Sequence, residues 1–200
     1  MRTAVSASMS LFLAALLVTA CADEAPTGTP PSTAATSTAG LSGSVSPSGS
    51  AGLFSATDIA WLQLTVAMNE RLLPLLDMVP SRTTDPAWQT FAARLGTAHR
   101  ADLSTARRLL AESGAPATNP HEGHDMPGMV TEQELTTLRS VTGVAFQRLA
   151  DQHLRAHLRQ AVRIATAEQR NGVYPATTAL ATEVVRAGNA ELTRLDRLTP

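Results

Sequence analysis

One short segment, from His121 to Met129, combines residue types that could bind a metal ion. It contains two histidines, His121 and His124, and two methionines, Met126 and Met129. Imidazole nitrogen together with thioether sulfur suits a soft ion, above all a copper ion as Cu(I), and suits Mg²⁺ or Ca²⁺ poorly. Glycine and proline within the segment disfavour regular structure, so the donors can converge in a loop. We therefore predict metal contact here. The alternative is a polar surface loop that holds these residues by chance.

A second candidate pair is His153 and His157, which lie four residues apart on a predicted helix. That spacing places both side chains on one side of the helix, where they could chelate a divalent or cuprous ion. The helical pattern puts His157 inside the apolar stripe and His153 toward its edge. Two histidines are too few to fill a site alone, so the competing interpretation is a satisfied core histidine beside a surface one.

The sequence does not predict an enzyme. Di-iron bundles need Glu-x-x-His motifs on two helices and a Glu from each of the others. Here Ala150 and Leu154 interrupt such a motif, and the first predicted helix has no histidine. The spacing of His121 and His124 also differs from the metalloprotease motif, which needs two histidines four residues apart on a helix. No glycine-rich phosphate loop is apparent.

The N-terminus predicts export and lipid attachment. Residues 1–20 read as a signal peptide, with Arg2 before an apolar stretch from Leu11 to Val18 that is too short to span a membrane. The sequence from Leu17 to Cys21 resembles a bacterial lipobox, in which the cysteine is lipidated. We therefore predict an extracytoplasmic protein anchored to the cell membrane through Cys21, with residues 21–53 as a Ser/Thr/Pro/Gly-rich tether.

Composition and charge limit the classes of partner and metal ligand that we expect. The formal net charge is −1, and all 16 basic residues are arginines. Because these arginines are spread along predicted helix faces, no nucleic-acid partner is expected. Cys21 is the only cysteine. Once it is lipidated, metal ligands must come from His, Met, Asp and Glu.

Residues 54–198 carry helical patterns throughout and predict one all-α domain, an antiparallel four-helix bundle. Short connections join four long helices, and a short extra helix precedes the third of them. Pro74 predicts a kink or an early end of the first helix. The expected helices cover residues 55–77, 86–113, 131–140, 144–171 and 175–198.

Local signals set the expected helix ends. Asp85-Pro86 reads as an N-cap followed by proline at the first helical position. Gly114 is a stop signal, and Thr131 with Glu134 forms a capping box. Asn171-Gly172 reads as a C-cap pair.

Several of these residues together resemble a known family, the ferritin-like domain of unknown function 305. The similarity covers about residues 54 to 198 and is carried by the loop and by the third long helix. The matching positions are His121 to Glu134 (HEGHDMPGMVTEQE), Gly143, Phe146-Gln147-Arg148, Ala156-His157, Ala161-Val162 and Glu168 to Gly172.

The resemblance implies a ferritin-like bundle, found often in exported bacterial proteins and linked in some members to copper. It also implies a His-His pair with methionines around it in each half. In this chain the second-half pair is His157-Leu158, and the first-half pair falls on Met68-Asn69.

These observations predict a lipoprotein that binds a copper ion for buffering or for transfer to a metal-handling partner protein, without turnover. The expected ligands are His121, His124, Met126, Met129, His153 and His157. The alternative is a bundle that has kept its fold, has no metal site and serves a structural or protein-interaction role. Apolar stripes alone suffice for the fold, so the fold does not decide between the two.

Overall fold

The computed structural model describes residues 53–116, 118, 120–121 and 123–198. The predicted signal peptide, Cys21 and the predicted tether up to residue 52 lie outside the described residues. Within the described part the fold is all-helical, which confirms the predicted class. The helices are α1 (Ala56–Arg82), α2 (Pro86–Ser113), α3 (Glu132–Ser140), α4 (Gly143–Asn171) and α5 (Pro175–Leu198).

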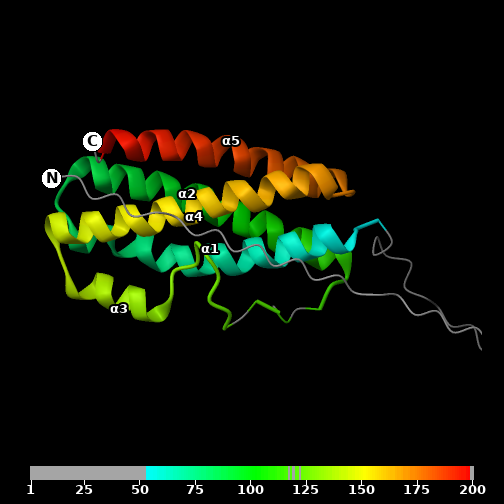
Figure 1. The fold of residues 1–200 in the computed structure, drawn as a ribbon, viewed down its shortest axis with the longest axis horizontal. Coiled ribbons are helices and arrows are strands. Elements are labelled where there is room, and N and C mark those ends of the chain that lie inside the picture. The colour runs from blue at the N-terminus through cyan, green and yellow to red at the C-terminus, as the bar shows by residue number, and fades with distance from the viewer. Residues whose placement is uncertain (1–52, 117, 119, 122, 199–200) are drawn as a thin grey trace, which may run out of the picture. The chain divides into compact units, whose positions relative to one another are not determined.

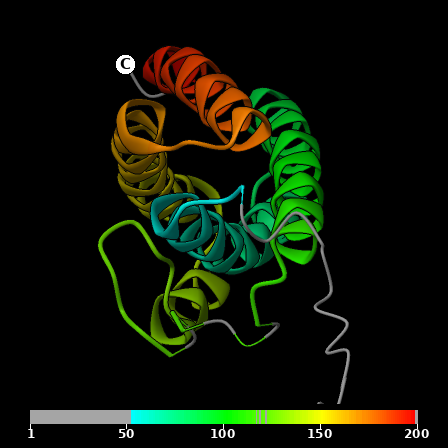
Figure 2. The same cartoon turned by 90° about the vertical axis from the view of Figure 1, so that its right-hand side faces the viewer.

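The four long helices form an antiparallel bundle built from two hairpins (Figures 1 and 2). Helix α1 pairs with α2, and α4 pairs with α5; the hairpins meet through α1 against α4 and α2 against α5. Helices α2 and α4 run in the same direction, so the chain between them travels back along the bundle. This connection holds the predicted metal loop and α3, which packs on α1 and α4. One long crossover of this kind is typical of ferritin-like bundles.

The helix starts follow the capping signals of the sequence. Ser55 caps α1 through a capping box with Asp58, and Asp85 caps α2 ahead of Pro86. Thr131 and Glu134 form the predicted capping box of α3. These side chains satisfy backbone N–H groups that have no partner inside the helix.

Of the two effects expected of Pro74, a kink or an early end of α1, the early end does not occur. The helix continues through Pro74 and Pro80 to Arg82. Proline inside a helix costs about 3 kcal/mol. The apolar face beyond it offsets this cost, because Leu75 and Val79 are fully buried, and burying one such side chain contributes about 1.5–3 kcal/mol.

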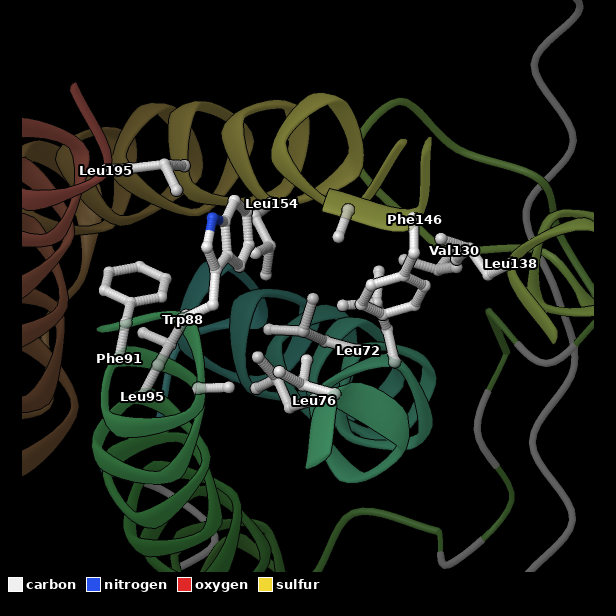
Figure 3. Close-up of a cluster of buried hydrophobic side chains, with 14 of the residues drawn as sticks. Leu72, Leu76, Trp88, Phe91, Leu95, Val130, Leu138, Phe146, Leu154 and Leu195 are labelled. Carbon is white, nitrogen blue, oxygen red and sulfur yellow. The ribbon is translucent and has the colours of Figure 1, made fainter. Parts of the chain in front are cut away.

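The main core lies at the end of the bundle where α2 and α4 begin (Figure 3). All four long helices contribute large buried side chains to it, and the loop and α3 close it with Val130 and Leu138. No side chain of this core is a candidate metal ligand, so we expect the bundle to fold without metal. Its largest labelled members are Leu72, Leu76, Trp88, Phe91, Leu95, Phe146, Leu154 and Leu195.

Among the helices that the structure describes, none combines the length and the apolar character needed to cross a membrane.

Candidate metal site in the bundle core

His157 lies on α4 and is 1% exposed. Its Nδ1 is 3.1 Å from the carbonyl oxygen of Gly128 in the crossover loop. Because a carbonyl oxygen only accepts, Nδ1 carries the hydrogen and donates, which leaves the lone pair on Nε2. That Nε2 is buried and has no hydrogen-bond partner among the described residues. The loop therefore fixes the tautomer and leaves a free nitrogen ligand inside the protein.

His99 on α2 lies against His157, with ring centroids 5.1 Å apart and an interplanar angle of 69°. Its Nδ1 hydrogen-bonds the Asn69 side-chain oxygen. The other end of that amide is fixed, because Asn69 Nδ2 donates to the Thr65 carbonyl over 2.8 Å. The Asn69 oxygen therefore accepts, His99 Nδ1 donates, and His99 Nε2 keeps its lone pair. Metal-binding histidines are held in this way, with the second ring nitrogen donating to a carbonyl or carboxylate.

Both imidazoles are neutral at physiological pH. Burial lowers the pKa of His99 to about 4. Burial, followed by the charge of His99, lowers the pKa of His157 to about 3, although the Gly128 hydrogen bond opposes this shift. A metal ion binds only the unprotonated nitrogen, so no proton has to be displaced from either ring.

A cavity of about 20 Å³ adjoins both rings and is also lined by Met68 and Asp102. A cavity needs about 10–15 Å³ to hold one water molecule, so this one has room for a single water or ion. Burial and the charge of Glu183 raise the pKa of Asp102 to about 6. The cavity thus offers imidazole nitrogen, thioether sulfur and one carboxyl group, all supplied by the bundle helices.

Methionines from the loop extend this site. Met68 and Met129 are 2% and 5% exposed and pack in one cluster, with Met126 partly buried at its edge. Two of the predicted ligands, Met126 and Met129, thus lie in one cluster with Met68 of α1. Met68 lines the cavity beside the imidazoles, and Met129 packs in the same cluster as Met68.

The loop histidines lie farther out. The rings of His121 and His124 have centroids 6.3 Å apart, and His124 is exposed. His121 lines a groove together with Leu64 and Ile164, which also pack against the cluster of Met68 and Met129. Partial burial and the nearby His124 lower the pKa of His121. His121 thus shares groove-lining neighbours with the methionine cluster, and His124 lies beside His121.

His153 and His157, the pair predicted from its spacing, have different neighbours in the structure. His153 Nδ1 lies 3.7 Å from a carboxylate oxygen of Glu134 on α3, and its side chain is 15% exposed. It can form an ion pair between α3 and α4 when protonated. His157 lies against His99 of α2, the helix across the bundle from α4.

Sequence reasoning missed His99. The available signal was its register on α2, where Trp88, Leu95, His99 and Leu103 follow one another at spacings of seven and four and are all buried. In the described part of the chain, no three His, Cys, Asp or Glu side chains form a group that could hold a metal ion. The candidate site therefore rests on two imidazoles together with thioether sulfur.

Comparison with known proteins identifies the family. The sequence matches the family profile of a domain of unknown function, DUF305, over residues 58–199. The chain belongs to the DUF305 family. The predicted resemblance is thereby confirmed. No curated protein matches the chain.

Two solved DUF305 structures share the fold. A DUF305 protein of Streptomyces coelicolor, named as a candidate secreted protein, is 18% identical, with a TM-score of 0.65 over 71% of this chain and 91% of that one. A DUF305 fragment from Deinococcus radiodurans is also 18% identical, with a TM-score of 0.66 over 72% of this chain and 96% of that one. At 18% identity, the similarity to these two structures shows a shared fold.

The DUF305 resemblance placed the first-half His-His pair on Met68 and Asn69, and both positions belong to the site. Met68 lines the cavity, and Asn69 fixes the tautomer of His99. At these two positions the chain therefore has a thioether that lines the cavity and an amide that fixes the tautomer of His99.

Acid should destabilise the bundle through the two buried histidines. The pKa values of His99 and His157 are about 4 and about 3 in the folded state and 6.5 when the side chains are exposed. Between pH 6.5 and about 3 the unfolded state therefore binds more protons than the folded state. The stability that they contribute is complete above pH 6.5 and falls as the pH drops toward 3. We expect a loss of up to about 1.4 kcal/mol per pH unit for each histidine. Urea unfolding at pH 7.5 and 5.0 measures this, with the His99→Gln/His157→Gln double variant as reference; equal pH dependence of both proteins would contradict it.

Proposed function

We propose that this DUF305 protein binds Cu(I) in the bundle core and serves to buffer it or to hand it to a partner protein. The ligands would be the Nε2 atoms of His99 and His157 and the sulfur atoms of Met68 and Met129. The observation that supports this most is the pair of neutral imidazoles whose Nδ1 atoms both donate to carbonyl oxygens beside one small cavity.

The donor set favours Cu(I) over other ions. Thioethers are soft ligands that suit Cu(I), whereas Mg²⁺ and Ca²⁺ take oxygen ligands and Zn²⁺ sites use thiolate, imidazole or carboxylate. Burying a monovalent ion also costs less electrostatic free energy than burying a divalent one, because only Asp102 among the cavity residues can supply a negative charge.

Binding and release fit the site better than turnover. A cavity of about 20 Å³ holds an ion and leaves no room for an organic substrate beside it. One ligand, Met129, and the carbonyl of Gly128 belong to the crossover loop, whereas Met68, His99 and His157 lie on rigid helices. Movement of this loop would open the site, and the exposed His124 and half-buried His121 next to it would meet the ion first.

The location that we propose is the extracytoplasmic face of the cell membrane. The lipobox-like sequence from Leu17 to Cys21 supports lipid attachment. The S. coelicolor DUF305 protein, a candidate secreted protein, is consistent with export in the family. A lipid anchor would keep a copper buffer where ions enter or leave the cell.

Cys21→Ser should abolish membrane anchoring. Without the thiol no acyl chain can be attached, so we expect the variant to leave the membrane fraction or to remain unprocessed. Firm anchoring needs more than one acyl chain, as in bacterial lipoproteins. Fractionation of cells with detection of the protein measures this. Normal processing with unchanged membrane retention of the variant would mean that Cys21 is not the anchor.

A competition titration tests copper binding itself. The purified protein would compete with a chromogenic chelator for Cu(I), and in parallel with a fluorescent chelator for Zn²⁺. The Met68→Leu/Met129→Leu variant removes both sulfur atoms at nearly equal volume. We expect it to weaken Cu(I) binding by at least about 10-fold, since changes around a metal ligand already cost about 10- to 100-fold, and to leave any Zn²⁺ binding nearly unchanged. Unchanged Cu(I) affinity would remove the thioethers from the site.

A further inference from the structure

Two buried carboxyl groups lie at the opposite end of the bundle, where α1 begins and α4 ends, and both lie against the turn that follows α4. Asp58 is 0% exposed and Glu168 is 1% exposed. Asp58 accepts hydrogen bonds from Ser55 N at 2.6 Å, Val173 N at 3.1 Å and Tyr174 N at 3.2 Å. A single carboxylate thus joins the first turn of α1 to the connection between α4 and α5.

Glu168 has the opposite environment. Neither of its carboxyl oxygens has a hydrogen-bond donor among the described residues. Its carboxyl group lies against the backbone of the turn, since a Cβ at Gly172 would stand 2.2 Å from Glu168 Oε1. An ionised Glu168 here would be buried, unsolvated and next to a second negative charge, whereas a protonated one can donate to Asp58.

We propose that Asp58 and Glu168 form a proton-linked clasp that fastens the start of α1 to the α4–α5 turn and loosens when Glu168 gives up the shared proton. The clasp closes the end at which the chain enters the bundle. Phe54 stacks on Tyr174 with ring centroids 3.8 Å apart, so the residues just after the predicted tether are held by the same contacts. Loosening would free them and lengthen the tether.

Few other titratable groups face the clasp. From the crossover loop, His121 lines the groove that also includes Glu168. From the turn, the Tyr174 hydroxyl donates to Glu112 of α2, away from the pair. On α1, Ser55 and Trp61 are the polar neighbours, and neither carries a charge at neutral pH. The proton equilibrium therefore belongs mainly to Glu168 and Asp58.

The pH range follows from the two carboxyl groups. Burial, together with the hydrogen bond and charge of Asp58, raises the pKa of Glu168 from 4.5 to about 8. The pKa of Asp58 is lowered despite burial, chiefly by the hydrogen bonds from Ser55 and Glu168. The contribution of Glu168 is therefore complete below pH 4.5, falls as the pH rises to about 8 and is constant above that. Asp58 stays ionised across this range.

Hydrogen exchange of the purified full chain tests the clasp. Peptides covering residues 53–60 and 170–178 would be followed at pH 5.5, 7.0 and 8.5 after correction for intrinsic exchange rates. We expect protection to fall by up to about tenfold per pH unit below pH 8. In Glu168→Gln, whose amide can donate to Asp58 at any pH, the protection should not change with pH. The control variant Glu183→Gln, on the surface of α5, should show the same pH dependence as the parent. A flat profile in the parent, or the same slope in Glu168→Gln, would overturn the proposal.

A second measurement decides the matter if Glu168→Gln fails to fold. Infrared spectra of the parent at pH 7 should contain a band from a buried protonated carboxyl group that disappears as the pH rises past 8. Absence of that band at pH 7 would show that Glu168 is ionised and that no clasp proton exists. Neither measurement involves copper, so their outcome is independent of the proposed metal site.

Discussion

Replacing His157 with glutamine is expected to lower the affinity for Cu(I) by at least about 100-fold, since removing a ligand costs no less than the 10- to 100-fold loss typical of changes around it. The substitution removes the Nε2 lone pair that lies buried without a hydrogen-bond partner. Glutamine keeps a polar group that can still donate to the carbonyl of Gly128, so the loop should remain docked. Competition with a chromogenic Cu(I) chelator at neutral pH measures the change.

His153→Gln is the matched control for this variant. His153 lies on the same helix, one turn away, and faces Glu134 on α3. We expect its loss to change Cu(I) affinity by less than the error of such a titration, whereas an i, i+4 chelate would lose as much as with His157→Gln. Equal losses for the two variants would restore the chelate predicted from spacing and refute the pairing of His157 with His99.

Gly128→Ala is expected to be the most damaging single change in the loop. Gly128 has φ of +83°, and a Cβ there would stand 2.6 Å from Gln160 Cβ and 2.9 Å from the Ala156 carbonyl oxygen. The left-handed conformation alone costs about 1–2 kcal/mol for a residue with a Cβ. The clash with α4 adds to this, so we expect a total loss of about 3–4 kcal/mol, near the upper end for point mutants. Displacing the loop would also remove the carbonyl that fixes His157.

Gly123→Ala is the control, because Gly123 also has a positive φ. Gly123 has φ of +77°, but nothing lies within 4 Å of its missing Cβ. We expect it to cost only the conformational part, about 1–2 kcal/mol. Urea unfolding of both variants separates the two contributions. If Gly128→Ala is no more destabilising than Gly123→Ala, the loop is not packed on α4 as described.

Much of the fold could be predicted from local signals. The Thr131–Glu134 capping box, the Asp85-Pro86 start and the stop at Gly114 depend on neighbouring residues only, so sequence reading placed these helix ends within a few residues. The continuation of α1 to Arg82 could not be read locally, because the cost of Pro74 is local while the burial that outweighs it comes from packing against other helices. Gly172 does end α4, but its φ is −69°, not left-handed. Because Gly172 has no side chain, the Glu168 carboxyl group fits against it. Capping rules do not predict such a contact.

The candidate site could be predicted only in part, because its residues come from α1, α2, α4 and the loop. Soft donors close together in the sequence identified Met129, and the apolar register identified His157. Met68 entered only through the family resemblance, as a position where a histidine was expected. The role of Asn69 depends on which nitrogen of His99 carries hydrogen, and that follows from contacts across the bundle.

X-ray absorption spectroscopy of the Cu(I)-loaded protein at the copper edge tests the central proposal most directly, because it reports the elements bound to the ion. The proposed site predicts a mixed first shell of imidazole nitrogen and thioether sulfur, with the sulfur contribution reduced in Met68→Leu/Met129→Leu and the imidazole contribution reduced in His99→Gln. A shell of nitrogen and oxygen alone, unchanged in both variants, would place the copper outside the bundle core and contradict the account.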